Sequence, residues 1–330
     1  MRVAFFSKKA YDQESFDQLL PEHEHKFTFF EAKLDYHTAS LAKGFDAICT
    51  FVNDELDKEI LTRLSSLGIH KIVLRCAGYN QVDLETAKNL GFQICRVPAY
   101  SPEAVAEHAF ALILTLSRKT HKAYNRVREA NFSLVGLTGF NLHGKTIGVI
   151  GTGAIGKAFC KIALGFGCKV LAFDPSERED LKSIGVNYVS IQELFQTSQI
   201  ISLHCPLTSE THHLINKETL KVMNDGVMLI NTSRGALIQT KDVIHALEQK
   251  KVAYLGIDVY EQEEDLFFQN LSEEILKDEH ISRLMTFPNV LITGHQAFLT
   301  KEALAEISRV TLLNLDQMEK GKHLENEIKF

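Results

Sequence analysis

The stretch TIGVIGTGAIGKAFCKIALGFGCKVLAFD, residues 146–174, decides the fold of this chain. Its first apolar run predicts a buried strand, and the apolar periodicity that follows predicts a helix. A second apolar strand then ends on an acid, Asp174. Between the first strand and the helix lie three glycines in the spacing G-x-G-x-x-G, which are Gly151, Gly153 and Gly156. This order of strand, glycine turn, helix and strand is typical of a dinucleotide-binding unit.

The same stretch predicts how a dinucleotide is held. The first glycine permits a tight turn, the second lets the backbone approach a pyrophosphate, and the third lets helix and strand pack closely. The phosphates then lie on the free N–H groups that begin the helix, near Ala154 and Ile155. Asp174 follows the last glycine by 18 residues (174 − 156), close to the expected spacing of about 20. Its carboxylate accepts a ribose 2′-OH and repels a 2′-phosphate, so the sequence predicts NAD rather than NADP.

Size and composition exclude several classes of function. The chain has 330 residues, enough for two domains of about 100–200 residues each. Its net charge is −6 and it has no basic run, so we expect neither nucleic acid nor a membrane surface as a partner. The start, MRVAFFSKKAYD, lacks the apolar region of a signal peptide, and no apolar run approaches the length of a membrane span. The six scattered cysteines indicate reduced thiols in a cytoplasmic protein.

No metal site is expected. The pairs His23-x-His25 and His212-His213 have no further cysteine or histidine at ligand spacing. We therefore interpret both pairs as solvated loop residues.

Strands alternate with helices through residues 1–100 and again through residues 145–260, which is typical of parallel sheets covered by helices. Between these blocks, a helical pattern starts at Ser101-Pro102 and runs to about Ala130. An amphipathic helix over Lys301–Lys320 could pack on either domain. The expected strands are 3–7, 26–31, 47–51, 72–76 and 92–96 in the first block, and 146–151, 168–174, 186–189, 199–204, 226–231, 252–258 and 289–294 after residue 145.

Open parallel sheets bind ligands outside the carboxyl ends of their strands, so polar residues just after strands are candidates for a site. Arg234 ends one such strand, and an arginine grips a planar carboxylate with two parallel hydrogen bonds. Thr232 and Ser233 add hydroxyl groups just before it. The other candidates that lie just after predicted strands are Gly78, Tyr79, His204, Asp258 and His295.

A histidine is the usual proton donor or acceptor near neutral pH. His204 and His295 both follow strands, so position alone hardly favours one over the other for this role. Cys205 and Pro206 could line a nicotinamide pocket. Asp258 could receive the nicotinamide carboxamide at the exposed end of its strand, or could simply terminate that strand. An acid beside the histidine favours its charged form, but pattern cannot choose within YEQEED, which offers Glu261, Glu263, Glu264 and Asp265.

Four motifs, in this order, resemble the D-isomer-specific 2-hydroxyacid dehydrogenase family: GVIGTGAIG, NTSRGALI, LGIDVYEQEED and NVLITGHQAF. The resemblance extends over nearly the whole chain, and the long forms RCAGYN, VPAYSPEAVAEHA, EEDLFF and GHQAFLT look most like the branch that acts on D-lactate. It implies an α/β fold of two doubly wound domains. A Rossmann NAD-binding domain, 101–298, is inserted into a flavodoxin-like substrate domain made of 1–100 and 299–330.

The family's catalytic residues fall on Arg234, Glu263 and His295, which decides against His204. Its substrate contacts fall on Ala77, Gly78, Tyr100 and Phe298, besides Arg234 and His295. The resemblance further implies a homodimer or homotetramer that reduces pyruvate to D-lactate with NADH. Two alternatives remain open: another D-2-hydroxy acid as substrate, or a non-enzymatic NAD-sensing regulator on the same fold.

Overall fold

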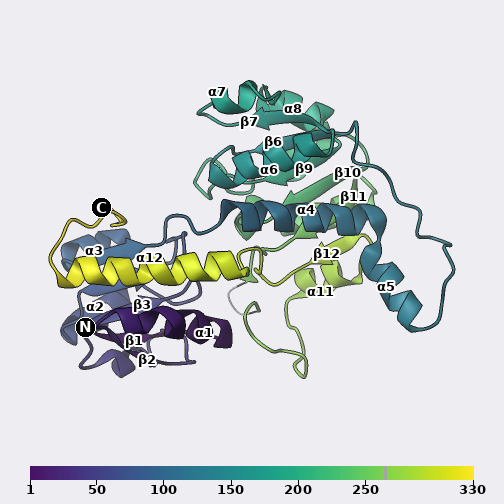
Figure 1. Ribbon diagram of the computed structural model, residues 1–330. Helices are drawn as coiled ribbons and strands as arrows, with labels where there is room; N and C mark the ends of the chain where they lie inside the picture. Colours follow the sequence, from purple (N-terminus) through teal and green to yellow (C-terminus); the bar gives the residue numbers. More distant parts are fainter. Residues whose placement is uncertain (264–265) are drawn as a thin grey trace. The chain divides into compact units, whose positions relative to one another are not determined.

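The computed structural model describes residues 1–263 and 266–330. The chain divides into two compact units, one made of Met1–Ser101 with Leu299–Phe330 and the other of Pro102–Phe298. Each unit contains a parallel β-sheet with helices packed on it, drawn in Figure 1. The predicted fold class, two doubly wound α/β domains, is confirmed.

The sheet of the first unit has the order β2-β1-β3-β4-β5, which is the flavodoxin-like order 2-1-3-4-5. Its inner strands are apolar and buried, as strands covered on both faces must be. The elements are β1 (Arg2–Phe5), α1 (Ala10–Leu19), η1 (Leu20–Glu22), β2 (Lys26–Phe29), η2 (Ala39–Ala42), β3 (Ala47–Thr50), α2 (Lys58–Ser66), β4 (Lys71–Leu74), α3 (Leu84–Asn89) and β5 (Gln93–Arg96).

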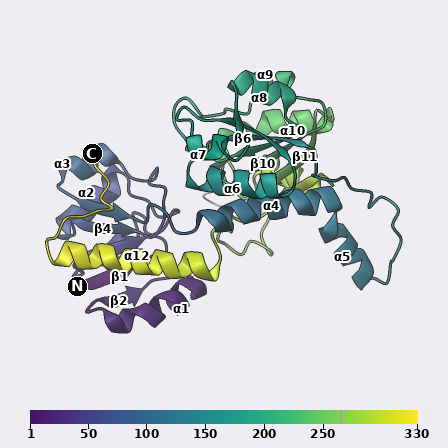
Figure 2. The same ribbon diagram turned by 45° about the horizontal axis from the view of Figure 1, so that its top comes forward.

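The C-terminal helix α12 (Lys301–Glu319) belongs to this first unit, where it packs on α1, β4 and β5. Figures 1 and 2 both show it, in yellow, alongside the sheet. Thr300 caps its start by accepting the backbone N–H of Ala303. Ile307, Leu315 and Met318 are buried on the face that meets the sheet.

The sheet of the second unit has the order β12-β11-β10-β9-β6-β7-β8, so that its first strand, β6, lies in the middle as in a Rossmann fold. Helix α4 packs against α6, β10 and β11. The elements are α4 (Pro102–Arg118), α5 (Thr120–Arg128), β6 (Thr146–Ile150), α6 (Ala154–Gly165), β7 (Lys169–Phe173), α7 (Glu179–Lys182), β8 (Asn187–Tyr188), α8 (Ile191–Thr197), β9 (Ile200–Leu203), α9 (Lys217–Val222), β10 (Val227–Asn231), η3 (Gly235–Leu237), α10 (Thr240–Glu248), β11 (Val252–Ile257), α11 (Glu279–Thr286) and β12 (Val290–Ile292). Across the described residues, no helix is both long enough and apolar enough to cross a bilayer.

The single long helix expected from Ser101 to about Ala130 is wrong, because two helices cover this region. The chain breaks at Lys119, which adopts a left-handed backbone conformation with φ of 54°. Its ammonium group donates to the carbonyl of Gly136, in the loop that follows α5. Helix α5 has no buried residue, so it separates from α4 where the apolar face ends.

Candidate active site

Three neighbouring parallel strands of the second unit end together at one edge of the sheet. In the register of β10, β11 and β12, Asn231 pairs with Ile257 and Ile257 pairs with Ile292. The residues that follow these strands therefore emerge at the same edge, where α/β sheets bind ligands. They include the candidates Arg234 and His295.

The imidazole of His295 and the carboxylate of Glu263 form the central contact of this edge. His295 Nδ1 lies 2.8 Å from Glu263 Oε1, and both side chains are partly buried. The second oxygen of Glu263 accepts the backbone N–H of Tyr260 at 2.8 Å, which fixes the carboxylate. A carboxylate held in this way orients the imidazole, while Nε2 stays available to a ligand.

The turn that carries His295 is held by the buried carboxylate of Asp258. This carboxylate accepts the backbone N–H groups of Gln296 and Ala297 and the hydroxyl of Thr293, and His108 Nε2 lies 3.4 Å away. Burial acts to raise the pKa of Asp258, but these hydrogen bonds, led by that of His108, outweigh it and lower the pKa. The carboxylate therefore stays charged and keeps the turn in place.

The expectation that Asp258 lies at an exposed strand end is wrong, because the residue is 0% exposed. A buried charge needs several hydrogen-bond donors, and the turn after β12 provides them. Two of these partners, His108 and Thr293, were missed by sequence reasoning. Histidine on a helix and threonine at a strand end are too common to single out, and only the fold brings them to Asp258.

His295 itself has a left-handed backbone, with φ of 54°, and its N–H donates to the carbonyl of Asp258 at 2.7 Å. This conformation is uncommon for a residue other than glycine and persists only where neighbouring contacts impose it. The backbone of Asp258 thus holds His295, while its side chain holds the two residues that follow.

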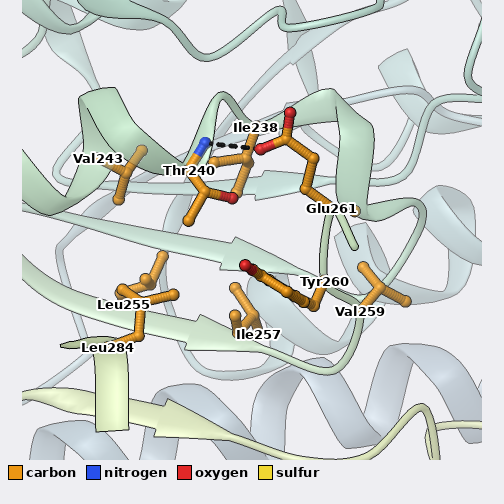
Figure 3. Close-up of a pocket in the computed structure, with 10 residues that line it drawn as sticks. Ile238, Thr240, Val243, Leu255, Ile257, Val259, Tyr260, Glu261 and Leu284 are labelled. Carbon is orange, nitrogen blue, oxygen red and sulfur yellow. Dashed lines mark hydrogen bonds between the residues drawn. The ribbon is translucent and has the colours of Figure 1, made fainter. Parts of the chain in front are cut away.

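The segment that carries Glu263 packs directly on Gly235, the residue after Arg234. A side chain at Gly235 would place a Cβ 2.0 Å from the carbonyl of Tyr260 and 2.4 Å from the N–H of Glu261. Only glycine allows this approach, so the turn after β10 and the acidic segment after β11 stay together. Figure 3 shows the small pocket beneath this crossing, with Tyr260 and Glu261 on its wall.

The structure distinguishes the acids of the YEQEED segment. Glu261 accepts the N–H of Thr240 at the start of α10, drawn in Figure 3, and lies 2.6 Å from His213 Nε2. Glu263 instead contacts His295. Glu264 and Asp265 lie outside the described residues. Of the two described acids, Glu263 is the partner of His295.

Arg234 is half-buried and its loop is tied to the sheet. The side-chain amide of Asn231 donates to the carbonyl of Arg234, and its oxygen accepts the N–H of Ser233. The guanidinium of Arg234 donates to the carbonyl of Ser233 at 2.7 Å. The hydroxyl of Ser233 donates to the carbonyl of Cys205, which links the loops after β10 and β9.

His204 has a different environment from His295. Its ring packs against Phe159 with centroids 4.7 Å apart, and its Nε2 lies 2.8 Å from the hydroxyl of Ser202. Burial lowers the pKa of His204 to about 3. An imidazole that stays neutral cannot donate a proton near pH 7, so the local chemistry favours His295 as the acid.

The glycine turn fits a dinucleotide. Gly151 has φ of 92°, and a Cβ at Gly156 would lie 1.9 Å from the carbonyl of Gly151, so both positions need glycine. A Cβ at Gly153 would meet nothing within 4 Å, and no side chain caps the start of α6 there, where Ala154 and Ile155 follow. The open N-terminus of this helix suits a pyrophosphate.

Asp174 lies beside this turn, where its carboxylate accepts the N–H groups of Thr152 and Ser176 at 2.6 and 2.8 Å. Near the loop after β10, the buried hydroxyl of Thr232 has no hydrogen-bond partner among the described residues, so a bound molecule could satisfy it. Cys205 is buried and Pro206 is exposed in the neighbouring loop after β9. These residues fit NAD.

The other predicted substrate contacts lie on loops at strand ends. In the first unit, the carbonyl of Ala77 accepts the guanidinium of Arg96 at 2.7 Å, and the carbonyl of Gly78 accepts the thiol of Cys76. Tyr100 follows β5 in the same unit. Phe298 ends the second unit and is buried. Their contacts with substrate stay predictions.

All four histidines of the two pairs lie in loops or turns and His212 is exposed, but the interpretation as solvated residues is wrong for His25. His25 is 6% exposed, and its Nε2 lies 2.9 Å from Asp316 Oδ1. His23 also contacts Asp316, and His213 contacts Glu261. Their acidic partners are distant in sequence, so spacing rules could not reveal them.

Comparison with known proteins assigns the family. The model of the NAD-binding domain of D-isomer specific 2-hydroxyacid dehydrogenases matches residues 110–297, which confirms NAD as the cofactor. The chain is 50% identical to the D-lactate dehydrogenase of Escherichia coli (strain K12) over 328 residues, covering 99% of this chain and 100% of that one.

Solved structures of related enzymes are similar to this chain over nearly its whole length. The pyruvate reductase of Chlamydomonas reinhardtii is 41% identical and superposes with a TM-score of 0.93, covering 99% of this chain and 98% of that one. The D-lactate dehydrogenase of Aquifex aeolicus, solved with NAD and lactic acid, is 37% identical with a TM-score of 0.86, covering 97% and 96%.

The packing on Gly235 gives a first prediction. Gly235→Ala forces the Tyr260–Glu261 backbone away, so the contact between Glu263 and His295 should be lost and unfolding should become easier by about 1–3 kcal/mol. A crystal structure of the variant and its thermal unfolding midpoint measure both effects. Gly165→Ala is the control, because a Cβ there meets nothing within 4 Å. An unmoved Glu263 in the Gly235 variant would contradict the prediction.

Proposed function

Because the chain belongs to the D-isomer specific 2-hydroxyacid dehydrogenase family, we propose that it catalyses the reversible reduction of pyruvate to D-lactate with NADH. The observation that carries the proposal is the 2.8 Å contact between His295 and Glu263 at the carboxyl edge of the NAD-binding sheet. This contact supplies a proton donor and the acid that orients it. Bound NADH supplies the hydride.

Arg234 is the proposed partner of the substrate carboxylate. Its planar guanidinium can bind a carboxylate through two parallel hydrogen bonds and can also polarise the adjacent keto group. The present bond from its side chain to the carbonyl of Ser233 uses one N–H and leaves others for a ligand.

His295 is the proposed acid of reduction and base of oxidation. In reduction, protonated Nε2 donates to the keto oxygen as negative charge develops there, and Nδ1 stays bonded to Glu263. In oxidation, the neutral imidazole accepts the proton of the lactate hydroxyl. Glu263 holds the ring in place, so we assign it a positioning role.

We also propose that the enzyme is a homodimer or homotetramer. Helix α5 and the loop after it project from the rest of the second unit, as Figure 1 shows. Phe132, Leu134 and Val135 in this loop are 73–80% exposed. Large apolar side chains gathered on one exposed segment favour burial against a second chain.

We also propose a cytoplasmic location, because the cysteines are buried thiols. All six cysteines are buried thiols outside any disulfide. Burial raises the pKa of Cys160 to about 12 and that of Cys205 to about 11, so both stay protonated. Such thiols suit a reducing compartment.

The proposed reaction predicts a substrate profile. Purified enzyme with NADH should reduce pyruvate with higher kcat/KM than branched or aromatic 2-keto acids, and only the D product should form. Absorbance of NADH measures the rates, and a chiral assay measures the product. A preference for a bulky keto acid would select the alternative dehydrogenase, and NADH binding without turnover of any keto acid would select the regulator.

Arg234→Lys should lower kcat/KM for pyruvate by about 10²–10³-fold, because an ammonium group cannot replace the planar pair of N–H donors. Arg283→Lys, which changes a surface arginine paired with Glu248, is the matched control and should keep full activity. Steady-state kinetics at saturating NADH measure both. Near-normal efficiency of the Arg234 variant would reject the carboxylate role.

Glu263→Gln should lower kcat for pyruvate reduction by about 10²-fold with little change in KM, because the amide no longer holds His295 in the orientation from which it donates its proton. Glu261→Gln is the control, since its carboxylate contacts His213 rather than His295. Steady-state kinetics at saturating NADH measure both constants, and an unchanged kcat in the Glu263 variant would disprove the pairing.

A further inference from the structure

A second cluster of polar side chains lies in the first unit and belongs to none of the predicted sites. Asp316, near the end of α12, accepts two imidazoles on its two oxygens. His23 Nδ1 lies 3.1 Å from Oδ2, and His25 Nε2 lies 2.9 Å from Oδ1. The ligand atoms of the three side chains all lie within 4.8 Å of one another.

The backbone places both histidines on one side. His23 has extended torsions, φ of −125° and ψ of 151°, and residues two apart in an extended segment point the same way. Their rings are nearly parallel, with planes 15° apart and centroids separated by 6.2 Å. Two imidazoles and one carboxylate converging in this way form a donor set that suits zinc and similar ions.

The cluster is both fixed and accessible. The side chain of His25 is 0% exposed, so its ring is set by the packing around it. The side chains of His23 and Asp316 are 22% and 25% exposed, which leaves a path for an ion and room for a water ligand. The ligand atoms lie within 4.8 Å of one another and must lie roughly 3.4 Å apart for tetrahedral zinc with bonds of about 2.1 Å.

Two charged groups of opposite sign face the second ring nitrogen of His25. Its Nδ1 lies 3.7 Å from Glu319 Oε2 and 3.2 Å from the α-amino group of Met1. A carboxylate beside the second ring nitrogen is the usual outer partner of a metal-binding histidine.

We propose that His23, His25 and Asp316 bind a divalent transition metal ion of the zinc type, with water as a fourth ligand. The ion joins the segment before β2 to the last turns of α12. His25 and Asp316 are 291 residues apart in the sequence. Because the ion binds only when these parts are assembled, it stabilises the folded first unit by mass action.

The test is calorimetric titration of the full-length, EDTA-treated protein with zinc chloride. We expect one zinc ion per chain at this site and a rise of the thermal unfolding midpoint when zinc is present. His23→Ala and Asp316→Asn should each weaken zinc binding by at least about tenfold and should abolish the rise of the unfolding midpoint. Losses of this size are typical even for residues that only hydrogen-bond a metal ligand.

Matched controls separate this site from others. His212→Ala removes an exposed histidine of the second pair and should bind zinc as the parent does. Unfolding midpoints in EDTA show whether the His23 and Asp316 variants are folded, and pyruvate reduction in EDTA should stay at the parent level. Zinc binding that is absent from the parent, unchanged in both variants, or lost only in His212→Ala would overturn the proposal.

Discussion

The active edge of the second unit depends on the buried carboxylate of Asp258. An ionised group without water is costly unless donors surround it, and here the donors belong to the turn that carries His295. The turn donates hydrogen bonds to the carboxylate of Asp258. In return, Asp258 holds the turn with His295 in its left-handed backbone conformation, which is unfavourable without such contacts. The position of His295 is therefore fixed by Asp258, a residue that need not touch the substrate itself.

The first unit also has a buried carboxyl group that binds several loops. Asp54 is buried beyond β3 and accepts the hydroxyl of Ser7 and the backbone N–H groups of Leu34 and Phe51. The fully buried guanidinium of Arg75 lies between two phenylalanine rings nearby and donates to the carbonyl of Ser7. In each unit, one buried acid thus fixes loops at the carboxyl edge of a parallel sheet, where side chains for binding must be placed accurately.

Much of this arrangement could be predicted from the sequence, because it depends on local patterns. Apolar runs gave the strands, and the spacing of Gly151, Gly153 and Gly156 gave the nucleotide turn. Polar residues after strands pointed to Arg234 and His295. These signals work because a parallel sheet places consecutive strand ends at one edge, whatever the loops between them do.

What the sequence could not predict depends on contacts between distant segments. The break at Lys119 comes where the apolar face of α4 ends and is accompanied by a bond to Gly136 across a loop, and the burial of Asp258 depends on a turn 35 or more residues later. Pattern alone left Glu261 and Glu263 open, since both lie in one acidic run, and only the family resemblance selected Glu263. In the structure, the backbone of this run packs on Gly235, the carboxylate of Glu261 reaches the start of α10, and that of Glu263 reaches His295. Two chemically equal acids thus have different partners because the fold places them differently.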